Sequence, residues 1–367
     1  MRMENKAIHF KGLNGIRAIA AIGVVISHIS ITTNVLIPRF NLHNLHFGNS
    51  MADYGVTMFF TLSGFLISYL LISEKNNNQI NIKNFYIRRI LRIWPLYYAY
   101  MTISLVLVYS FHLYPSQFNS LYYIFFAGNI AYAIGIMPFP FISHFWSIGV
   151  EEQYYLFWPW LIQKSKNIFK GIIIFLIVFI VLRIIMRYLL YKYGTSVSIP
   201  YAFFYNTRFG CMAIGASGAL LFFRKQALFL KIATSLPVQI VAWLSIVLIC
   251  LNKFTIGSFL SHEVAGCVTL CIIISQIVAK NRIINLDNKI CEFLGKISYG
   301  IYVIHPLVMF FYFKVMLFYN FSSIWFVFAA YPVVIVLTVF TAYISYEYYE
   351  KIFLRAKKKY TVVASVV

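Results

Sequence analysis

Residues 13 to 35 read L-N-G-I-R-A-I-A-A-I-G-V-V-I-S-H-I-S-I-T-T-N-V. The run is longer than the roughly 20 predominantly apolar residues that a helix needs to cross a bilayer. It nevertheless contains two ionisable side chains, Arg17 and His28. A charged group inside a membrane helix costs at least about 2.5 kcal/mol on insertion scales, so such residues commonly have a function. We therefore predict a membrane helix that carries a functional polar face.

Comparable apolar runs recur along the chain. Of its 367 residues, 61% are apolar, 19% are aromatic and 11% are charged, whereas about a quarter of the residues in a soluble domain are charged. This composition predicts an all-α integral membrane protein with a single membrane domain over residues 1–367, a core at about 10–350 and a basic cytoplasmic tail at 351–367. The candidate spans lie at 13–35, 52–73, 94–111, 120–137, 146–163, 168–191, 202–223, 236–252, 259–280, 298–319 and 323–347.

The charges between these segments indicate how many of them cross. Lys and Arg gather in cytoplasmic loops, yet if every segment crossed, the basic clusters at 164–170, 224–231 and 280–289 would lie outside. The short segment 120–137 is interrupted by glycines and precedes a proline. Treating it as a re-entrant or interfacial piece places all three clusters inside. We therefore predict ten transmembrane helices plus this short segment, with both termini cytoplasmic.

Charge and cysteine content exclude several function classes. The net charge of +21 comes mainly from short segments between apolar runs, as the positive-inside rule predicts, so no nucleic acid partner is expected. The five cysteines lack the spacing of a metal site, and no metal is expected. Only residues 1–12 precede the first apolar run, so we expect that run to be retained rather than cleaved as a signal peptide.

The two ionisable side chains of the first span share one helix face. Arg17 and His28 are eleven residues apart, which is nearly three helical turns, or about 16 Å along the axis. Arg17 is expected near the cytoplasmic surface and His28 in the outer half. A neutral imidazole can take a proton near pH 7, so His28 is the best candidate for a general base. The alternatives are an imidazole bonded to a neighbouring helix and an arginine that reaches the lipid interface.

The segment H-F-W-S-I-G-V-E-E-Q-Y-Y, which begins at His144, contains two of the ten acidic residues in the chain. Ser147, Glu151 and Tyr155 recur at intervals of four and therefore share one helix face. Glu151 is a candidate to hold the imidazolium that forms when His28 accepts a proton, as a carboxylate does in a catalytic triad. The alternative is a carboxylate favoured by the dipole at a helix N-terminus, which is the simpler explanation of the adjacent glutamate.

Three arginines precede a Trp-Pro pair at the predicted cytoplasmic edge. Arg88, Arg89 and Arg92 are suited to a phosphate-bearing donor, because guanidinium groups bind phosphate bidentately. Arg89 and Arg92 share a helix face. An ordinary positive-inside anchor explains the same residues. Small residues at mid-span around Ser63 are expected to pack helices closely.

Five patterns, taken together, resemble the acyltransferase 3 family of membrane O-acyltransferases and cover the chain from about residue 10 to residue 350. They are L-N-G-I-R ending at Arg17 with His28 eleven residues later, F-F-x-x-S-G-F from Phe59, R-x-x-R from Arg89 with W-P, F-W-S-x-x-x-E-E-Q-Y-Y from Phe145, and L-G-K-I-S-Y-G-I-Y-x-x-H-P from Leu294.

This resemblance implies roles for the residues that carry it. The expected catalytic residues are His28, Glu151, Arg17 and Ser147. Arg89, Arg92, Arg88 and Arg17 are expected to bind the donor. The residues expected to bind the acceptor are Ser63, Tyr155, Trp146 and His305.

The resemblance also implies an activity. The expected reaction transfers an acyl group, acetyl from acetyl-CoA, to a hydroxyl of a cell-envelope glycan such as O-antigen (lipopolysaccharide) or exopolysaccharide. It proceeds directly or through an acylated residue, in the bacterial cytoplasmic (inner) membrane. The expected partners are the acyl-CoA donor, a glycan or glycolipid acceptor, membrane lipids and, as an open option, a second copy of the chain. The alternative function is a transporter or flippase of a glycolipid or acyl intermediate, for which no inverted repeat is apparent.

The chain departs from the family pattern in two places. Many relatives have an acidic residue just before the double phenylalanine, where this chain has Thr57, and the nearest acid is Asp53. The chain ends soon after its last apolar run, so we expect no fused esterase-like domain. The membrane domain is then expected to complete the transfer itself or to pass the acyl group to a separate protein.

Overall fold

The computed structural model describes residues 8–36, 48–77, 80–113, 120–136, 140–254, 259–319, 324–361 and 365–366. This part of the chain is almost entirely helical, and its two strands form a short parallel pair. In chain order the elements are β1 (Ile8–His9), α1 (Leu13–Leu36), α2 (Met51–Asn76), α3 (Ile82–Ser110), α4 (Leu121–Ile124), α5 (Gly128–Ala133), the 3-10 turn η3 (Ser143–Phe145), α6 (Trp146–Lys164), α7 (Ile168–Tyr193), the 3-10 turn η4 (Gly194–Val197), α8 (Ser198–Thr207), α9 (Phe209–Phe223), α10 (Ala227–Ala233), α11 (Leu236–Cys250), α12 (Ser261–Val278), α13 (Lys289–Lys296), α14 (Ser298–Phe318), α15 (Ile324–Ser345), the π-helical turn η5 (Tyr346–Glu350), α16 (Lys351–Lys357), the 3-10 turn η6 (Lys358–Tyr360) and β2 (Ser365–Val366).

The described helices include enough long apolar stretches for a multi-span membrane protein. Seven of them are long and apolar enough to cross a bilayer, or eight if the pair α10 and α11, bent by 53°, forms one span. The seven count Ile168–Phe223 as a single stretch and leave out α6, which is 19 residues long and contains two glutamates. The all-α membrane class is therefore confirmed, whereas the ten spans and the cytoplasmic termini stay predictions.

The segment predicted to be re-entrant or interfacial forms no crossing helix. Its described residues form α4 and α5, which are four and six residues long. Between them Phe126 adopts a left-handed conformation with φ 56°. A straight crossing needs about 20 helical residues, so neither helix crosses a bilayer. Residue 137, the last of the predicted segment, lies outside the described residues.

The chain divides into two compact units, and the division falls within α2. The first unit comprises Met1–Phe59, Ala227–Phe353 and Ala364–Val367, and the second comprises Phe60–Gln226 and Leu354–Val363. The assignment of a single membrane domain stays a prediction.

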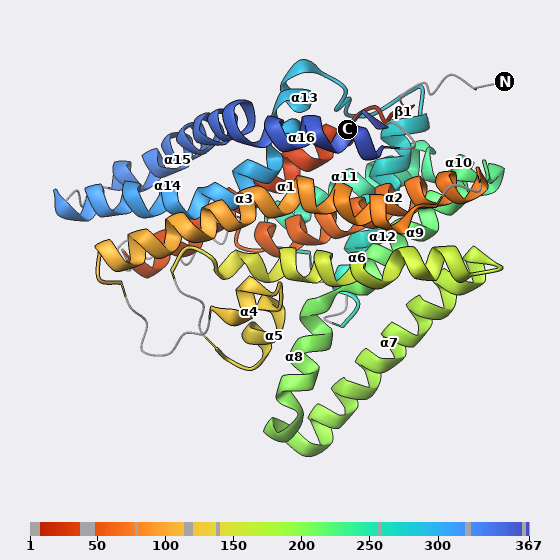
Figure 1. The fold of residues 1–367 in the computed structure, drawn as a ribbon, viewed down its shortest axis with the longest axis horizontal. Helices are drawn as coiled ribbons and strands as arrows, with labels where there is room; N and C mark the ends of the chain where they lie inside the picture. Colours follow the sequence, from red (N-terminus) through yellow and green to blue (C-terminus); the bar gives the residue numbers. More distant parts are fainter. Residues whose placement is uncertain are drawn as a thin grey trace. The chain divides into compact units, whose positions relative to one another are not determined.

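Helix α1 supplies part of the core of the first unit. Val25 and Ile29 of α1 pack with Ile301 of α14 and Val334 of α15, and all four side chains are fully buried. Helices α14 and α15 lie side by side as a hairpin (Figure 1). Helix α1 is therefore held against α14 and α15.

Two glycines bring α2 and α9 into backbone contact in the second unit. A Cβ atom on Gly64 would lie 2.0 Å from the carbonyl oxygen of Met212, and one on Gly215 would lie 2.0 Å from that of Thr61. Only a residue without a side chain allows this approach. Gly64, in the second quoted motif, thus has a packing role.

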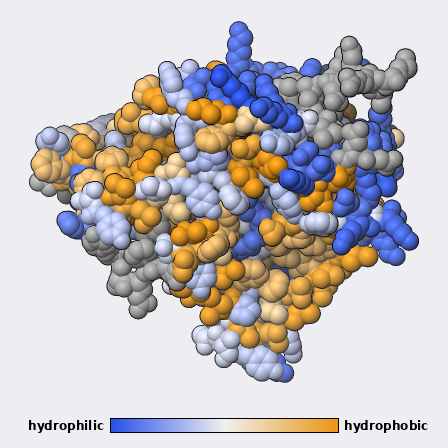
Figure 2. All heavy atoms as spheres, viewed as in Figure 1, coloured by the Kyte–Doolittle hydropathy of each residue, from blue (hydrophilic) through white to orange (hydrophobic). Residues whose placement is uncertain are grey.

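Helices α7 and α8 form a hairpin in the second unit (Figure 1). The outer surface of α7 exposes Ile177, Ile184 and Tyr191, and Figure 2 shows this region as largely hydrophobic. An exposed apolar surface of this kind is expected where a helix faces lipid.

Candidate active site

The predicted site residues belong to both units. Those of the first unit are Arg17, His28 and His305. Those of the second are Ser63, Arg88, Arg89, Arg92, Trp146, Ser147, Glu151 and Tyr155.

Two histidines form a direct pair in the first unit. Nδ1 of His28 on α1 lies 2.7 Å from Nε2 of His305 on α14. The two rings are stacked at 23°, with centroids 5.0 Å apart. His305 is fully buried and His28 is half-buried. A residue predicted to bind the acceptor is thus the partner of the residue predicted to be the base.

The position of His305 depends on the proline that follows it within α14. Pro306 has no N–H and cannot donate the helical hydrogen bond to the carbonyl of Tyr302, four residues earlier. Nδ1 of His305 lies 2.7 Å from this carbonyl oxygen and 3.2 Å from that of Ile301. The His-Pro pair of the fifth motif therefore turns the imidazole back onto its own helix.

Arg17 belongs to a polar chain that joins α1 to α13. Its Nη1 donates to Oδ1 of Asn14 at 3.2 Å, and Nδ2 of Asn14 donates to Oε2 of Glu292 at 2.8 Å. The two helices can approach closely here because Gly295 has no side chain. A Cβ atom at this position would lie only 2.2 Å from the Asn14 carbonyl oxygen. The first and fifth sequence motifs thus pack against each other. Sequence reasoning missed Glu292, whose signal is an acid in the first turn of α13.

Glu151 is bonded to the second motif in the other unit. Oγ of Ser63 on α2 donates to Oε1 of Glu151 on α6 at 2.8 Å. The structure therefore joins one predicted catalytic residue to one predicted acceptor-binding residue. Because His28 belongs to the first unit and is bonded to His305, the orienting role of Glu151 stays a prediction.

Arg89 lies between aromatic rings of α3 and α6. Its guanidinium carbon is 5.8 Å from the ring centroid of Tyr155 and 5.9 Å from that of Phe85. At these distances the ring faces attract the guanidinium electrostatically. Its Nε is buried and makes no hydrogen bond to any described residue. Arg92 follows one turn later on the same helix, so both side chains remain suited to an anionic ligand.

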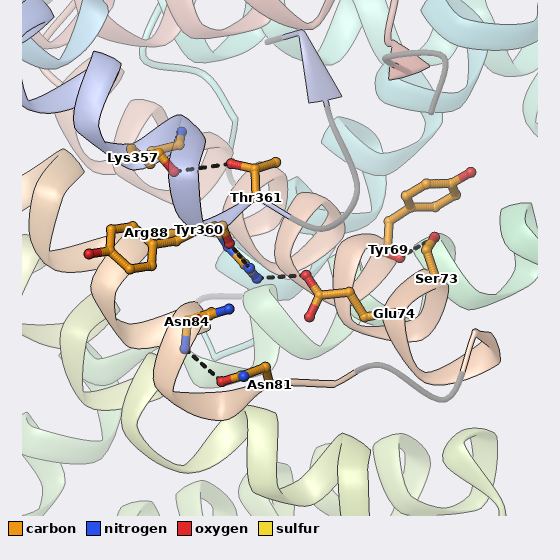
Figure 3. A network of polar contacts seen from close by, with 9 residues as sticks. All are labelled: Tyr69, Ser73, Glu74, Asn81, Asn84, Arg88, Lys357, Tyr360 and Thr361. Carbon is orange, nitrogen blue, oxygen red and sulfur yellow. Dashed lines mark hydrogen bonds and ion pairs between the residues drawn. The ribbon is translucent and has the colours of Figure 1, made fainter. Parts of the chain in front are cut away.

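Arg88 lies between Glu74 and the backbone of Tyr360, as Figure 3 shows. Its Nη2 forms a buried ion pair with Oε1 of Glu74 at 2.7 Å, and its Nη1 donates to the backbone carbonyl oxygen of Tyr360 at 2.9 Å. The guanidinium thus ties α2 and α3 to η6. Sequence reasoning missed Glu74, although an acid at the end of an apolar run was a signal. This geometry favours a structural role for Arg88, and donor binding by it stays a prediction.

Two further predicted residues begin α6. Oγ of Ser147 donates to the carbonyl oxygen of His144 at 3.1 Å, a local bond at the start of the helix. The ring of Trp146 meets that of Phe60 at 6.4 Å, and the guanidinium carbon of Arg208 lies 5.3 Å from its centroid. Trp146 therefore packs against the second motif.

Thr57, at the position where the resemblance led us to expect an acid, contacts a histidine. Its Oγ1 lies 3.1 Å from the carbonyl oxygen of Asp53 and 3.0 Å from Nδ1 of His262. Since the hydroxyl has a single proton to donate to the carbonyl, it accepts from His262. Sequence reasoning missed His262. No group of three or more metal-ligating side chains occurs among the described residues.

The chain is similar to several curated proteins over part of its length. It is 31% identical over 162 residues to the peptidoglycan O-acetyltransferase OatA of Listeria monocytogenes serovar 1/2a (strain ATCC BAA-679 / EGD-e), covering 40% of this chain and 23% of that protein. It is 29% identical over 184 residues to YrhL of Bacillus subtilis (strain 168), named as a candidate peptidoglycan O-acetyltransferase, covering 46% of this chain and 26% of that protein. A protein of Staphylococcus aureus (strain COL), named as a candidate O-acetyltransferase, is 29% identical over 170 residues, with 42% and 25% covered.

These matches cover about a quarter of the length of the curated relatives. No solved structure is significantly similar to the chain. The family described as "Acyltransferase domain" matches residues 10–347, which is nearly the whole chain. The resemblance carried by the five motifs is thereby confirmed, and the chain belongs to the acyltransferase 3 family.

Proposed function

We propose that this protein transfers an acetyl group from acetyl-CoA to a hydroxyl of a cell-envelope glycan at the bacterial inner membrane. Family membership supports acyl transfer, and the names of the relatives support a glycan acceptor. The observation that carries the proposal is the His28–His305 pair on two membrane helices. Peptidoglycan joins O-antigen and exopolysaccharide among the acceptors to be tested.

The proposed chemistry begins at His28. Its imidazole accepts the proton of a sugar hydroxyl while the sugar oxygen attacks the carbonyl carbon of the thioester. The C–S bond then breaks, and the departing coenzyme A thiolate takes the proton from the imidazolium. Arg89 and Arg92 would bind the phosphates of the donor, because planar guanidinium groups match phosphate oxygens. Arg17 supplies a further cation on the same helix as the base.

Transfer of a labelled acetyl group tests the proposal directly. The purified protein, in liposomes, is incubated with acetyl-CoA labelled in the acetyl group and with peptidoglycan fragments, O-antigen or exopolysaccharide. We expect label to become covalently bound to at least one glycan. Movement of a glycolipid across the bilayer without covalent labelling would instead favour a transporter and would overturn the proposal.

Two substitutions distinguish the effect of losing a donor-binding arginine from the effect of losing the neighbouring Arg88–Glu74 ion pair. We expect Arg92→Gln to raise the KM for acetyl-CoA about tenfold or more, because a charge-assisted hydrogen bond contributes about 1.5 to 3 kcal/mol. The measurement is the dependence of the initial transfer rate on acetyl-CoA concentration.

Glu74→Gln serves as the matched control, because it removes a charge beside Arg88 and leaves the other two arginines intact. It is expected to lower the unfolding temperature and to change the KM for acetyl-CoA by less than about twofold. Equal KM increases in the two variants would contradict the assignment of the donor site to Arg92.

A further inference from the structure

The proton on His305 can be located from its surroundings. Nδ1 lies within 3.2 Å of two backbone carbonyl oxygens, those of Ile301 and Tyr302. A carbonyl oxygen can only accept a hydrogen bond, so Nδ1 must carry the hydrogen. The shorter bond, at 2.7 Å, is to the carbonyl oxygen of Tyr302, to which Pro306 cannot donate because it has no N–H. The tautomer of His305 is thus set by its own helix.

This assignment determines the tautomer of His28 as well. A neutral imidazole has one N–H and one lone pair, so Nε2 of His305 carries the lone pair and accepts a hydrogen bond. The donor is Nδ1 of His28, at 2.7 Å. A cationic His305 would reverse this bond, but a cation at a fully buried position of a membrane helix is strongly unfavourable. The lone pair of His28 must then reside on Nε2.

Nε2 is the nitrogen of His28 that remains available to a substrate. The ring is half-buried, and no hydrogen bond from any described residue reaches this atom. When Nε2 takes the hydroxyl proton, the bond from Nδ1–H to His305 becomes charge-assisted and strengthens. A neutral imidazole thus has the place that a carboxylate has in a catalytic triad, where it fixes the tautomer and stabilises the imidazolium.

We propose that His305 is a positioning residue that holds His28 in the tautomer with its lone pair on Nε2, so that His28 is ready to act as a base. This inference rests on the proposed function of His28. It assigns no contact between His305 and the substrate.

Two substitutions separate positioning from packing. His305→Leu removes the acceptor, and we expect it to lower kcat for acyl transfer about 10- to 150-fold, the loss of one hydrogen bond to a charged group. The KM values should change by less than about twofold. In His305→Gln, the side-chain amide oxygen can take the place of Nε2 as the hydrogen-bond acceptor. This variant is expected to retain at least about a fifth of the wild-type kcat. An unchanged kcat in His305→Leu, or equal losses in both variants, would overturn the inference.

The tautomer itself can be observed without turnover. In liposomes, solid-state NMR of protein labelled with ¹⁵N-histidine distinguishes protonated from unprotonated ring nitrogens, and the His28 signals are assigned by their loss in His28→Gln. We expect Nδ1 to be protonated in the wild type and a shift toward protonated Nε2 in His305→Leu.

The NMR measurement and the transfer assay test the positioning role and the proposed function separately. A wild-type protein that has this tautomer but transfers no acetyl group would overturn the proposed function and leave the pairing intact. A wild-type His28 protonated on Nε2 in a protein that does transfer acetyl groups would overturn only the positioning role.

Discussion

Replacing His28 with alanine is expected to lower the rate of acetyl transfer by about 10²- to 10⁴-fold, the usual contribution of a general base. The imidazole is the proposed base, and its Nδ1 lies 2.7 Å from Nε2 of His305, so the substitution removes both the base and the contact that orients it. The measurement is the initial rate of glycan acetylation per folded molecule, with the folded fraction determined by size-exclusion chromatography in detergent. Undiminished acetylation would remove His28 from the mechanism.

A second histidine provides the control for this substitution. His112 is exposed just after α3 and has a positive φ of 52°. Asparagine tolerates this conformation better than alanine does. We therefore expect His112→Asn to retain the full transfer rate, and a loss comparable to that of His28→Ala would show that the assay reports a general effect of changing histidines.

The substitution Gly64→Ala is expected to destabilise the protein by about 3 kcal/mol or more, at or beyond the upper end of the usual cost of overpacking. The added Cβ would lie 2.0 Å from a carbonyl oxygen of α9, and backbone cannot move aside as a flexible side chain can. Helices α2 and α9 would have to separate. Thermal unfolding in detergent, followed by intrinsic fluorescence, measures the loss.

The same substitution at Gly23 provides the control. The Cβ atom added there first meets Cε of Met51 at 3.4 Å, an ordinary van der Waals distance to the end of a flexible side chain. Alanine also favours a helix over glycine by about 0.5 to 1 kcal/mol. Gly23→Ala should therefore leave the unfolding temperature unchanged or raise it. A similar loss of stability in both variants would contradict the proposed role of the α2–α9 contact.

Apolar runs predicted most of the helices, because a helix that crosses the hydrocarbon core of a bilayer is predominantly apolar over its whole length. The run 13–35 corresponds to α1 at Leu13–Leu36, and 298–319 to α14 at Ser298–Phe318. The run 94–111 was too short, because α3 already begins at Ile82. Its first turns are polar and basic, and the side chain of Asn81 caps them. Hydrophobicity alone does not report such an extension.

Composition also did not predict an interruption of the helix within one apolar run. The predicted span 202–223 is divided into α8 and α9 at Arg208, which has a left-handed backbone with φ 47°. Glycine or asparagine would have signalled this conformation, whereas arginine rarely adopts it. The structure therefore depends here on tertiary contacts that local preference does not encode.

Site residues were easier to name than to pair. His28 and His305 were both singled out from the sequence, but 277 positions separate them. Their contact depends on how α1 and α14 pack. The arginines at the start of α3 show the same limit, since the sequence does not reveal that Arg88 pairs with Glu74 and with the carbonyl oxygen of Tyr360.

The hydrogen bond from Arg88 to Tyr360 affects how mutations near the end of this sequence should be interpreted. The acceptor is a main-chain oxygen, and every amino acid presents the same atom there. A mutational scan would therefore score this position as tolerant, while a stop codon introduced just before it would remove this hydrogen bond to the guanidinium. Tolerance to substitution and tolerance to truncation are separate properties at this end of the molecule.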